Sequence, residues 1–308
     1  MHPEENLLDA LNKQGANIAY SCRAGQCQAC LLQSPGMVNP AWQKGLRQSQ
    51  IDAGFFYSCQ AKVREEGLQV FSGKIFEVQT RAKIVSKKVL ADDILLLHVE
   101  TDKKIPFSAG QFVNLINASG LSRPYSLANT ARDNLLEFHI RILPKGKFGQ
   151  WLTEEAEVGS EIQVGEASGD CTLGPTLSGA MVLIGTGTGL APLICIAKEL
   201  LLRNYNEPIY LYHGSRKQSG LYCVEELKAL EKNYSNFKYI PCCSGEQAEG
   251  IAFGRAHDIA FKEAPLSDDT NLFLCGHPQM VQTSKKKAFL QGLSLSNIKH
   301  DAFFNQAS

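Results

Sequence analysis

The sequence predicts a three-domain protein that combines α+β and α/β architecture, and three observations lead to this prediction. The chain has 308 residues, which exceeds the usual size of a single domain. Short apolar runs, one with a clear period of two, fill the middle of the chain, as antiparallel strands do. From about residue 179, apolar runs alternate with helical stretches, the pattern of a parallel sheet with helices on both faces. We expect the domains at residues 1–73, 77–176 and 177–308.

Composition and charge exclude several classes of function. The chain holds 31 basic and 31 acidic residues, a formal charge of zero, so no long-range field favours nucleic acid or an acidic membrane. The N-terminus lacks the basic start and apolar core of a secretory signal. No apolar stretch reaches the roughly 20 residues of a membrane span. We therefore expect a cytoplasmic monomer whose ten cysteines stay reduced.

The first domain is defined by a cysteine cluster in "YSCRAGQCQAC", Tyr20 to Cys30. Its three cysteines have the spacing C-x4-C-x2-C, and a fourth follows at Cys59, so the candidate metal ligands are Cys22, Cys27, Cys30 and Cys59. This is the plant-type [2Fe–2S] pattern, in which one loop supplies three thiolates. A zinc site is the alternative, although structural zinc usually draws its ligands as two close pairs.

The second domain contains apolar runs typical of short strands, "AKIVSKKV", "DILLLHVE", "GQFVNLIN" and "LLEFHIRIL". Phe138, Ile140 and Ile142 alternate with His139 and Arg141 in the last of these, which indicates a half-buried strand. Short strands separated by Gly and Pro predict a small antiparallel barrel. Taken alone, "SRPYSLAN" could be a turn leading into an exposed strand.

The third domain carries two loops at strand ends. "LIGTGTGLAP" follows an apolar strand and opens a helix, and "LCGHPQM" ends another strand. Glycines let a backbone approach a pyrophosphate, and both loops would lie at the carboxyl edge of the sheet, where open α/β folds bind ligands. The first loop is not G-x-G-x-x-G, and a turn that serves only compactness is its alternative.

Taken in order, these motifs resemble the iron–sulfur flavoprotein reductases of the ferredoxin–NADP reductase superfamily, which include those of benzoate dioxygenase, soluble methane monooxygenase and deoxysugar synthesis. The resemblance implies a β-grasp ferredoxin-like domain, an antiparallel β-barrel FAD domain and a parallel-sheet α/β NAD domain. The chain departs from the family at Gln28, where a glycine is usual. Only six residues precede Leu7, whereas the family begins with a strand hairpin, so we expect a first domain that is truncated at its N-terminus or weakened.

The resemblance also implies a flavin site in the second domain. Arg123 would meet the FAD pyrophosphate, Tyr125 would lie against the isoalloxazine, and Ser126 would reach flavin N5, with Pro124 between them. The family's R-x-x-P-G-G-x-F-S segment matches "RILPKGKFG", so the N–H groups of Gly146, Lys147, Phe148 and Gly149 would hold the pyrophosphate. His139 and Ile140 would flank the flavin, although His139 also fits a solvated strand face.

In the third domain the resemblance implies a nicotinamide site. The nucleotide would lie on Gly185, Thr186, Gly187, Thr188 and Gly189, with Cys275 and Gly276 near the nicotinamide. Ser126 and Cys275 are the candidate catalytic residues. Phe303 or Phe304 would shield the flavin or simply pack. The absence of an arginine after Ser244 favours NADH, whereas Arg216 and Lys217 leave NADPH open.

The function implied is an NADH-dependent electron-transfer reductase. Electrons would pass from NADH through FAD and the [2Fe–2S] cluster to a partner protein such as an oxygenase component. One alternative is a flavin or ferric reductase whose thiols bind zinc or nothing, and another is a redox sensor without turnover.

Overall fold

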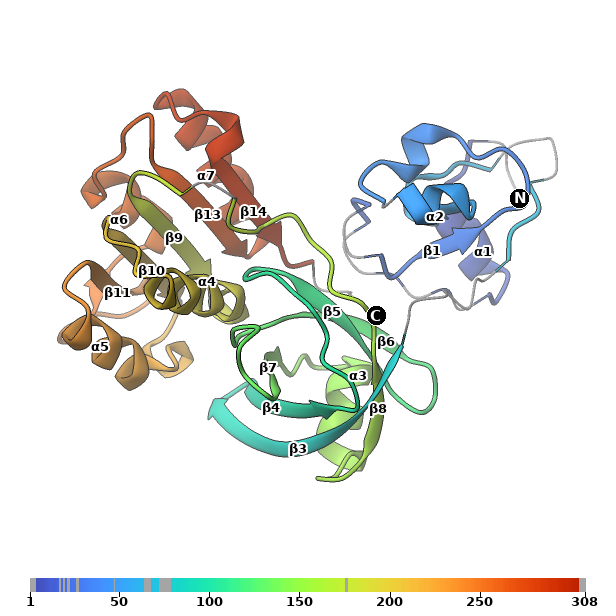
Figure 1. The fold of residues 1–308 in the computed structure, drawn as a ribbon, viewed down its shortest axis with the longest axis horizontal. Coiled ribbons are helices and arrows are strands. Elements are labelled where there is room, and N and C mark those ends of the chain that lie inside the picture. The colour runs from blue at the N-terminus through green and yellow to red at the C-terminus, as the bar shows by residue number, and fades with distance from the viewer. Residues whose placement is uncertain are drawn as a thin grey trace.

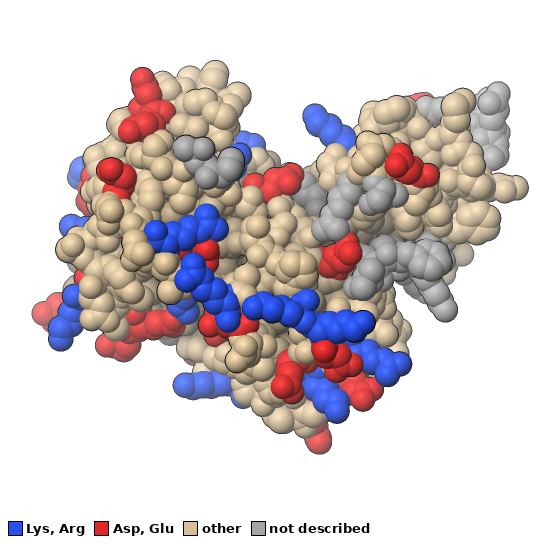
Figure 2. All heavy atoms as spheres, in the orientation of Figure 1, with Lys and Arg blue, Asp and Glu red and all other residues tan. Residues whose placement is uncertain are grey.

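A computed structural model describes residues 4–16, 18, 20, 23–25, 28–46, 48–63, 68–71, 79–174 and 177–304. Figure 1 shows three units in chain order, coloured blue, green and yellow to red. Figure 2 shows acidic and basic side chains interspersed on one face, in keeping with the formal charge of zero. In the described part of the chain, no helix is long and apolar enough to cross a membrane.

The first unit is small and has a short sheet. Helix α1 (Leu7–Lys13) begins at Asn6, whose side chain accepts a hydrogen bond from the Asp9 amide. The other elements are β1 (Leu31–Gln33), the 3-10 turn η1 (Pro40–Gln43), α2 (Gln48–Asp52), β2 (Phe55–Tyr57) and η2 (Ser58–Gln60). Strands β1 and β2 pair antiparallel, with Leu31 opposite Tyr57, so the end of the predicted cysteine loop lies beside the segment that carries Cys59.

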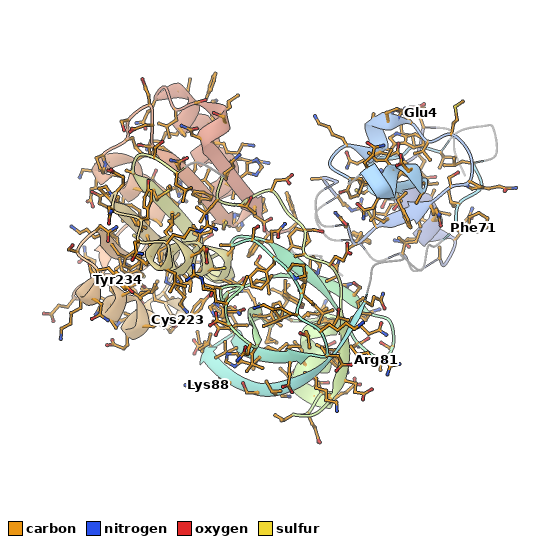
Figure 3. The ribbon with its side chains drawn as sticks, in the orientation of Figure 1. Glu4, Phe71, Arg81, Lys88, Cys223 and Tyr234 are labelled. Carbon is orange, nitrogen blue, oxygen red and sulfur yellow. The ribbon has the colours of Figure 1, made fainter. Side chains whose placement is uncertain are left out.

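The second unit is an antiparallel barrel with strand order β6-β5-β8-β3-β4-β7. The strands are β3 (Thr80–Ala91), β4 (Ile94–Thr101), β5 (Phe112–Ile116), β6 (Ser122–Ser126), β7 (Leu136–Arg141) and β8 (Glu161–Val164). Helix α3 (Lys147–Gln150) continues into a π-helical turn, Trp151–Glu155. Phe138 and Ile140 are fully buried in the barrel core, so their neighbours on β7 face outward. Figure 3 marks Arg81 and Lys88 along β3.

The third unit is a parallel sheet with strand order β12-β11-β10-β9-β13-β14. Its strands are β9 (Met181–Thr186), β10 (Ile209–Ser215), β11 (Phe237–Cys243), β12 (Ala252–Phe253), β13 (Asn271–Gly276) and β14 (Ile298–Ala302). Its helices are α4 (Leu190–Leu202), α5 (Val224–Asn233), α6 (Ala256–Glu263) and α7 (Pro278–Leu290), and its 3-10 turns are η4 (Gly187–Gly189), η5 (Gln218–Gly220) and η6 (Leu295–Asn297).

Helices cover both faces of this sheet. Leu183 packs with residues of α4 and α5, whereas Val182 and Ile184 pack with residues of α6 and α7. Strand order reverses between β9 and β13, and a crevice at the carboxyl ends of such strands is where doubly wound sheets bind ligands. The predicted fold class is confirmed. The elements that were not expected from the sequence include helix α6, the short strands β8 and β12, and the edge strand β14.

Candidate functional site

The cysteine loop brings two of its four predicted ligands together. Cys30 and Cys59 are buried in one small core, and the Ser58 amide and hydroxyl both donate to the Cys30 carbonyl, at 3.1 and 2.8 Å. The Gln60 side-chain amide donates to Cys59 Sγ at 3.4 Å. A sulfur that accepts a hydrogen bond beside a second buried cysteine fits a thiolate-bound cluster. Cys22 and Cys27 lie outside the described residues.

Gln28 occupies a backbone conformation that explains why glycine is usual in the family. Its φ is +55°, in the left-handed region that favours glycine. The side chain is 7% exposed, and its Oε1 accepts a hydrogen bond from Gln50 Nε2 on α2 at 3.3 Å. The side chain therefore turns toward α2 and ties the cysteine loop to that helix.

Strand β6 carries the predicted flavin residues Arg123, Pro124, Tyr125 and Ser126. The Tyr125 ring packs on Phe148 with centroids 5.4 Å apart, which brings the two predicted flavin segments together. Asn114, opposite Pro124 in the sheet, has a buried Oδ1 with no hydrogen-bond partner among the described residues. Such an orphaned acceptor fits a site that an N–H-bearing ligand completes. The residues present on β5 and β6 thus fit a flavin.

The second flavin segment begins at the end of β7. Gly146 is the N-cap residue of α3, and its amide bonds to the Leu143 carbonyl at 2.9 Å. A Cβ on Gly149 would lie 3.5 Å from Ile142, an ordinary contact, so a side chain there would fit. Ile140 points into the barrel core, and only its backbone is available to a ligand. The roles of Gly146, Lys147, Phe148 and Gly149 stay predictions.

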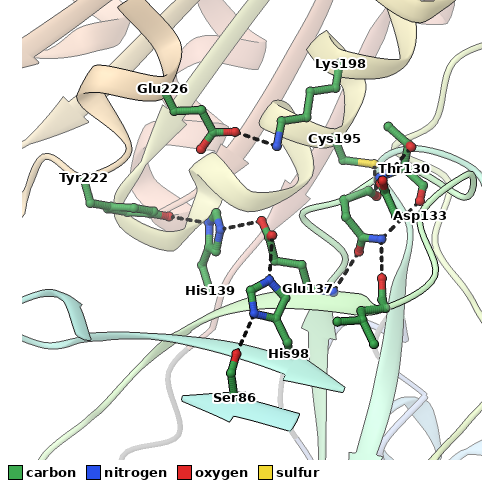
Figure 4. Close-up of polar contacts among 12 residues, drawn as sticks. Ser86, His98, Thr130, Asp133, Glu137, His139, Cys195, Lys198, Tyr222 and Glu226 are labelled. Atoms are coloured by element: carbon green, nitrogen blue, oxygen red, sulfur yellow. Dashed lines mark hydrogen bonds and ion pairs between the residues drawn. The ribbon is translucent and has the colours of Figure 1, made fainter. Parts of the chain in front are cut away.

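His139 belongs to a buried polar chain that crosses from the barrel to the sheet domain (Figure 4). Its Nδ1 lies 3.2 Å from the Tyr222 hydroxyl, and its Nε2 lies 3.3 Å from Glu137 Oε1. His98 Nε2 lies 3.0 Å from Glu137 Oε2, and Ser86 is 2.7 Å from His98 Nδ1. Burial raises the pKa of Tyr222 well above its usual value, so its hydroxyl keeps its proton, for which the Gly187 carbonyl oxygen is an acceptor at 3.5 Å.

Glu137 is the one acidic group in this chain of contacts. Burial raises the pKa of Glu137, but hydrogen bonds and the charge of His139, helped by Lys198 and His98, outweigh it and bring the pKa to about 2. The carboxylate therefore stays ionised and accepts from both imidazoles. His139 is thus a buried member of the domain boundary, and the solvated strand face considered above is wrong for it.

The glycine turn after β9 fits against the end of β13. A Cβ on Gly189 would lie 2.2 Å from the Cys275 carbonyl oxygen, and one on Gly276 would lie 2.5 Å from the Thr186 carbonyl oxygen. The Thr186 hydroxyl accepts from the His277 amide at 3.0 Å. The two predicted loops are therefore one surface, in which Gly189 and Gly276 let backbone pack directly on backbone. A glycine turn that opens a helix at the end of a strand suits a pyrophosphate. Gly185 pairs with Cys275 directly below this surface.

Barrel and sheet meet at this turn. The guanidinium of Arg141, the last residue of β7, lies 2.8 Å from where a Cβ on Gly187 would stand. The Tyr222 hydroxyl lies 3.5 Å from the Gly187 carbonyl oxygen. Sequence reasoning missed Arg141, Tyr222 and Asn114 as site residues. The only available signal was the position of Arg141 at the start of "RILPKGKFG".

Cys275 is fully buried, and its thiol lies 3.7 Å from that of Cys171. Burial, with the neighbouring Cys171, raises the pKa of Cys275 well above its usual value. The Phe303 amide donates to the Gly276 carbonyl at 2.7 Å, so the end of the chain lies beside this strand. The predicted roles of Cys275 and Phe303 beside the cofactors stay predictions.

A barrel whose strand β6 carries the R-x-Y-S segment, a doubly wound sheet with a glycine turn and a cysteine loop together define a class. This class is that of the flavin- and nicotinamide-dependent iron–sulfur oxidoreductases. Family comparisons match all three parts. They identify a 2Fe-2S iron-sulfur cluster binding domain over residues 1–64, an oxidoreductase FAD-binding domain over 81–172 and an oxidoreductase NAD-binding domain over 183–286.

Whole-chain relatives narrow the class. The chain is 30% identical over 307 residues to the ferredoxin–NAD(P)+ reductase component of the naphthalene 1,2-dioxygenase system of Pseudomonas putida, covering 97% of this chain and 93% of the relative. It is 30% identical to the reductase subunit of an aromatic O-demethylase of Amycolatopsis, covering 98% and 94%. The crystal structure of the Amycolatopsis cytochrome P450 reductase GcoB superposes with a TM-score of 0.73 at 30% identity, covering 98% and 95%.

The chain therefore belongs to the family of ferredoxin–NAD(P)+ reductase components, and the resemblance is confirmed. It is an NAD(P)H-dependent oxidoreductase with [2Fe–2S], FAD and NAD(P) domains. The reductase components among its relatives favour electron transfer over the flavin- or ferric-reductase alternative.

Proposed function

We propose that the protein transfers electrons from NADH to an acceptor protein, an oxygenase component or one of similar chemistry. The observation that carries this proposal is the proximity of Arg141 of the barrel to the Gly187 turn of the sheet domain, which supports a flavin site and a nicotinamide site that adjoin each other. When bound, the nicotinamide and flavin supply two-electron chemistry, and the cluster supplies one-electron transfer. We further propose a cytoplasmic monomer.

In this proposal the chain's own residues bind and orient. Arg123 pairs with the flavin pyrophosphate as a charge-assisted donor, and Tyr125 with Phe148 forms an apolar wall. Ser126, 9% exposed at the end of β6, holds its hydroxyl at the flavin. Cys275 and Gly276 border the nicotinamide, and Cys22, Cys27, Cys30 and Cys59 hold the cluster.

The preference for NADH is supported by the adenosine end of the nucleotide site. Ser244 and Gly245 donate their amides to the Ser215 and Arg216 carbonyls, at 3.1 and 2.9 Å. The next residue, Glu246, accepts from the Gln218 amide at 2.5 Å. A carboxylate here suits a ribose hydroxyl and repels a 2′-phosphate. We expect kcat/KM for NADH to exceed that for NADPH at least about tenfold, and Glu246→Gln to narrow the ratio. Equal values for the two nucleotides in the wild type would refute the preference.

The function itself is tested with two electron acceptors. Ferricyanide takes electrons from flavin, whereas cytochrome c reduction should depend on the cluster. We expect Cys27→Ser to abolish the cluster's visible absorbance and most NADH–cytochrome c activity, while FAD and NADH–ferricyanide activity remain. Cys242→Ala, which alters a buried thiol in the sheet domain, is the control and should keep both activities. Loss of both activities in Cys27→Ser, or of neither, would contradict the proposed route.

A further inference from the structure

Two thiols from different domains touch behind the nucleotide surface. Cys171 lies in the segment that follows β8 of the barrel, and Cys275 lies near the end of β13. They are 104 residues apart in sequence, yet their sulfurs are 3.7 Å apart, and their exposures are 3% and 0%. Both residues belong to one buried core cluster, so each thiol packs against the other.

The backbone of Cys275 has little freedom. It pairs with Gly185 of β9 on one side and Asp301 of β14 on the other. Gly189 packs so closely on its carbonyl that a Cβ there would overlap the oxygen, at 2.2 Å. With the backbone held on three sides, the position of the thiol depends on one torsion, χ1.

The backbone of Cys171 is held as firmly, but by the barrel. A Cβ on Gly110 would lie 2.0 Å from the Cys171 carbonyl oxygen, so the chain passes there in direct contact. Three residues before Cys171, Ser168 exchanges two hydrogen bonds with Phe112 of β5, both 2.9 Å long. Cys171 is thus a fixed group of the flavin domain that reaches into the nicotinamide domain.

We propose that Cys171 is a positioning residue that holds the Cys275 thiol in one χ1 rotamer and in register with the flavin barrel. This rests on the proposed place of Cys275 beside the nicotinamide. The thiol–thiol contact selects one of three staggered wells. Without it, Cys275 could occupy more than one well, and equal occupancy of all three would lower the fraction in the productive rotamer to about one third.

The test is a double-mutant cycle on the holoenzyme with Cys171→Ala, Cys275→Ala and the double variant. The readout is anaerobic stopped-flow flavin reduction at saturating NADH, alongside the Kd for NADH and the FAD content. We expect Cys275→Ala to slow reduction up to about 10²-fold and Cys171→Ala to slow it about threefold, with NADH affinity kept. Because Cys171 acts through Cys275, the double variant should match Cys275→Ala alone.

Two further variants separate positioning from packing. Cys171→Ser keeps a small polar group against the Cys275 thiol and should lie closer to wild type than Cys171→Ala. Cys242→Ala removes an equally buried thiol elsewhere in the sheet domain and should leave the rate unchanged. The FAD content identifies any variant that fails to fold. If Cys171→Ala fails in this way, Cys171→Ser is compared with the wild type in its place.

The outcomes distinguish this inference from the proposed function. A wild-type rate in Cys171→Ala with a slow Cys275→Ala overturns the positioning role and leaves Cys275 in place. The positioning role is also overturned if adding Cys171→Ala to Cys275→Ala slows the reaction by the same factor as Cys171→Ala alone. The two thiols would then act independently. A wild-type rate in Cys275→Ala removes that residue from the nicotinamide site, and the positioning role with it, while the electron-transfer function stands on the cluster variant.

Discussion

The cysteine loop and the nucleotide turn, the two loops proposed to bind cofactors, place their backbone by different means. In the cysteine loop, Arg23 and Gln28 have φ values of +52° and +55°, and both carry full side chains. In the nucleotide turn, Gly189 has an ordinary φ of −60° but lies where a Cβ would be 2.2 Å from another carbonyl. The first loop needs an unusual backbone conformation, and the second needs backbone packed so closely on backbone that no Cβ atom fits between. A side chain in the cysteine loop therefore costs a modest amount of backbone strain, whereas a side chain at Gly189 would overlap the backbone of β13.

The largest effect should follow from adding a Cβ atom at Gly189. We expect Gly189→Ala to destabilise the sheet domain by about 3 kcal/mol or more, because the methyl group meets backbone that cannot move aside. NADH-driven flavin reduction should fall by at least about 10²-fold, while FAD stays bound. Thermal unfolding and stopped-flow reduction measure the two effects. Gly36→Ala is the control, since its nearest neighbour would be 3.7 Å away, and a near-normal Gly189→Ala would contradict the steric argument.

The difference between the two loops also marks what the sequence predicts and what it does not. The strands with a period of two, such as Leu136–Arg141, and the motifs at strand ends were readable because their signals are local. The contacts of His139 with Tyr222 and of Cys171 with Cys275 join residues 83 and 104 positions apart. Neither the hydrophobic period nor the spacing of motifs in the sequence predicts contacts between residues so far apart. The edge strand β14 was missed because "IKHDA" has neither alternation nor an apolar run.

Low pH should destabilise the barrel and sheet domains more than the domain that carries the cysteine loop. Burial, with the charge of His139, lowers the pKa of His213 to about 3 from its ordinary 6.5. The unfolded chain therefore binds a proton that the folded chain does not, and stability falls as pH drops from 6.5 toward 3. Glu137, with a pKa of about 2 against an ordinary 4.5, adds a loss in the same direction below pH 4.5. The predicted cluster domain, residues 1–73, has His2 as its single histidine.

We therefore expect the barrel and sheet domains to lose thermal stability between pH 6.5 and 4.5, before the cluster domain does. The measurements are FAD release and cluster bleaching on heating at each pH. His213→Gln should flatten the upper part of the FAD curve, whereas His277→Gln, at an exposed loop position, should not. Parallel loss of cluster and FAD across this range would contradict the assignment to His213.

The proposed flavin site differs from both loops, because there we expect a charged side chain, that of Arg123, to bind the cofactor. We expect Arg123→Ala to weaken FAD binding by about 10- to 100-fold, because charge-assisted hydrogen bonds contribute roughly 1.5–3 kcal/mol each. Equilibrium dialysis of the deflavinated protein measures this. Arg81→Ala removes a cation from β3 of the same barrel and is the matched control (Figure 3). Unchanged FAD affinity in Arg123→Ala would remove this residue from the site.

The smallest effect should follow from Gln28→Gly, which returns the cysteine loop to the residue that its backbone favours. Glycine removes a left-handed cost of roughly 1–2 kcal/mol but adds about 0.4–1 kcal/mol of unfolded-chain entropy. It also loses the bond to Gln50, worth about 1 kcal/mol. These contributions nearly cancel, so Gln28→Gly should change the stability of the cluster domain by no more than about 1 kcal/mol. The bleaching temperature of the cluster and its iron loss to a chelator should shift only slightly.

Gln50→Ala provides the comparison for this last prediction, because it removes the side-chain partner and leaves the φ of Gln28 unchanged. It should weaken the loop by about 1 kcal/mol, a larger loss than Gln28→Gly causes. If Gln28→Gly instead loses the cluster outright, the buried amide pair between the loop and α2 holds the ligands in place. The cysteine loop would then require the side chain of Gln28 as strictly as the nucleotide turn requires that Gly189 have none. The two loops would then be equally intolerant of substitution and would differ only in the kind of contact that they need.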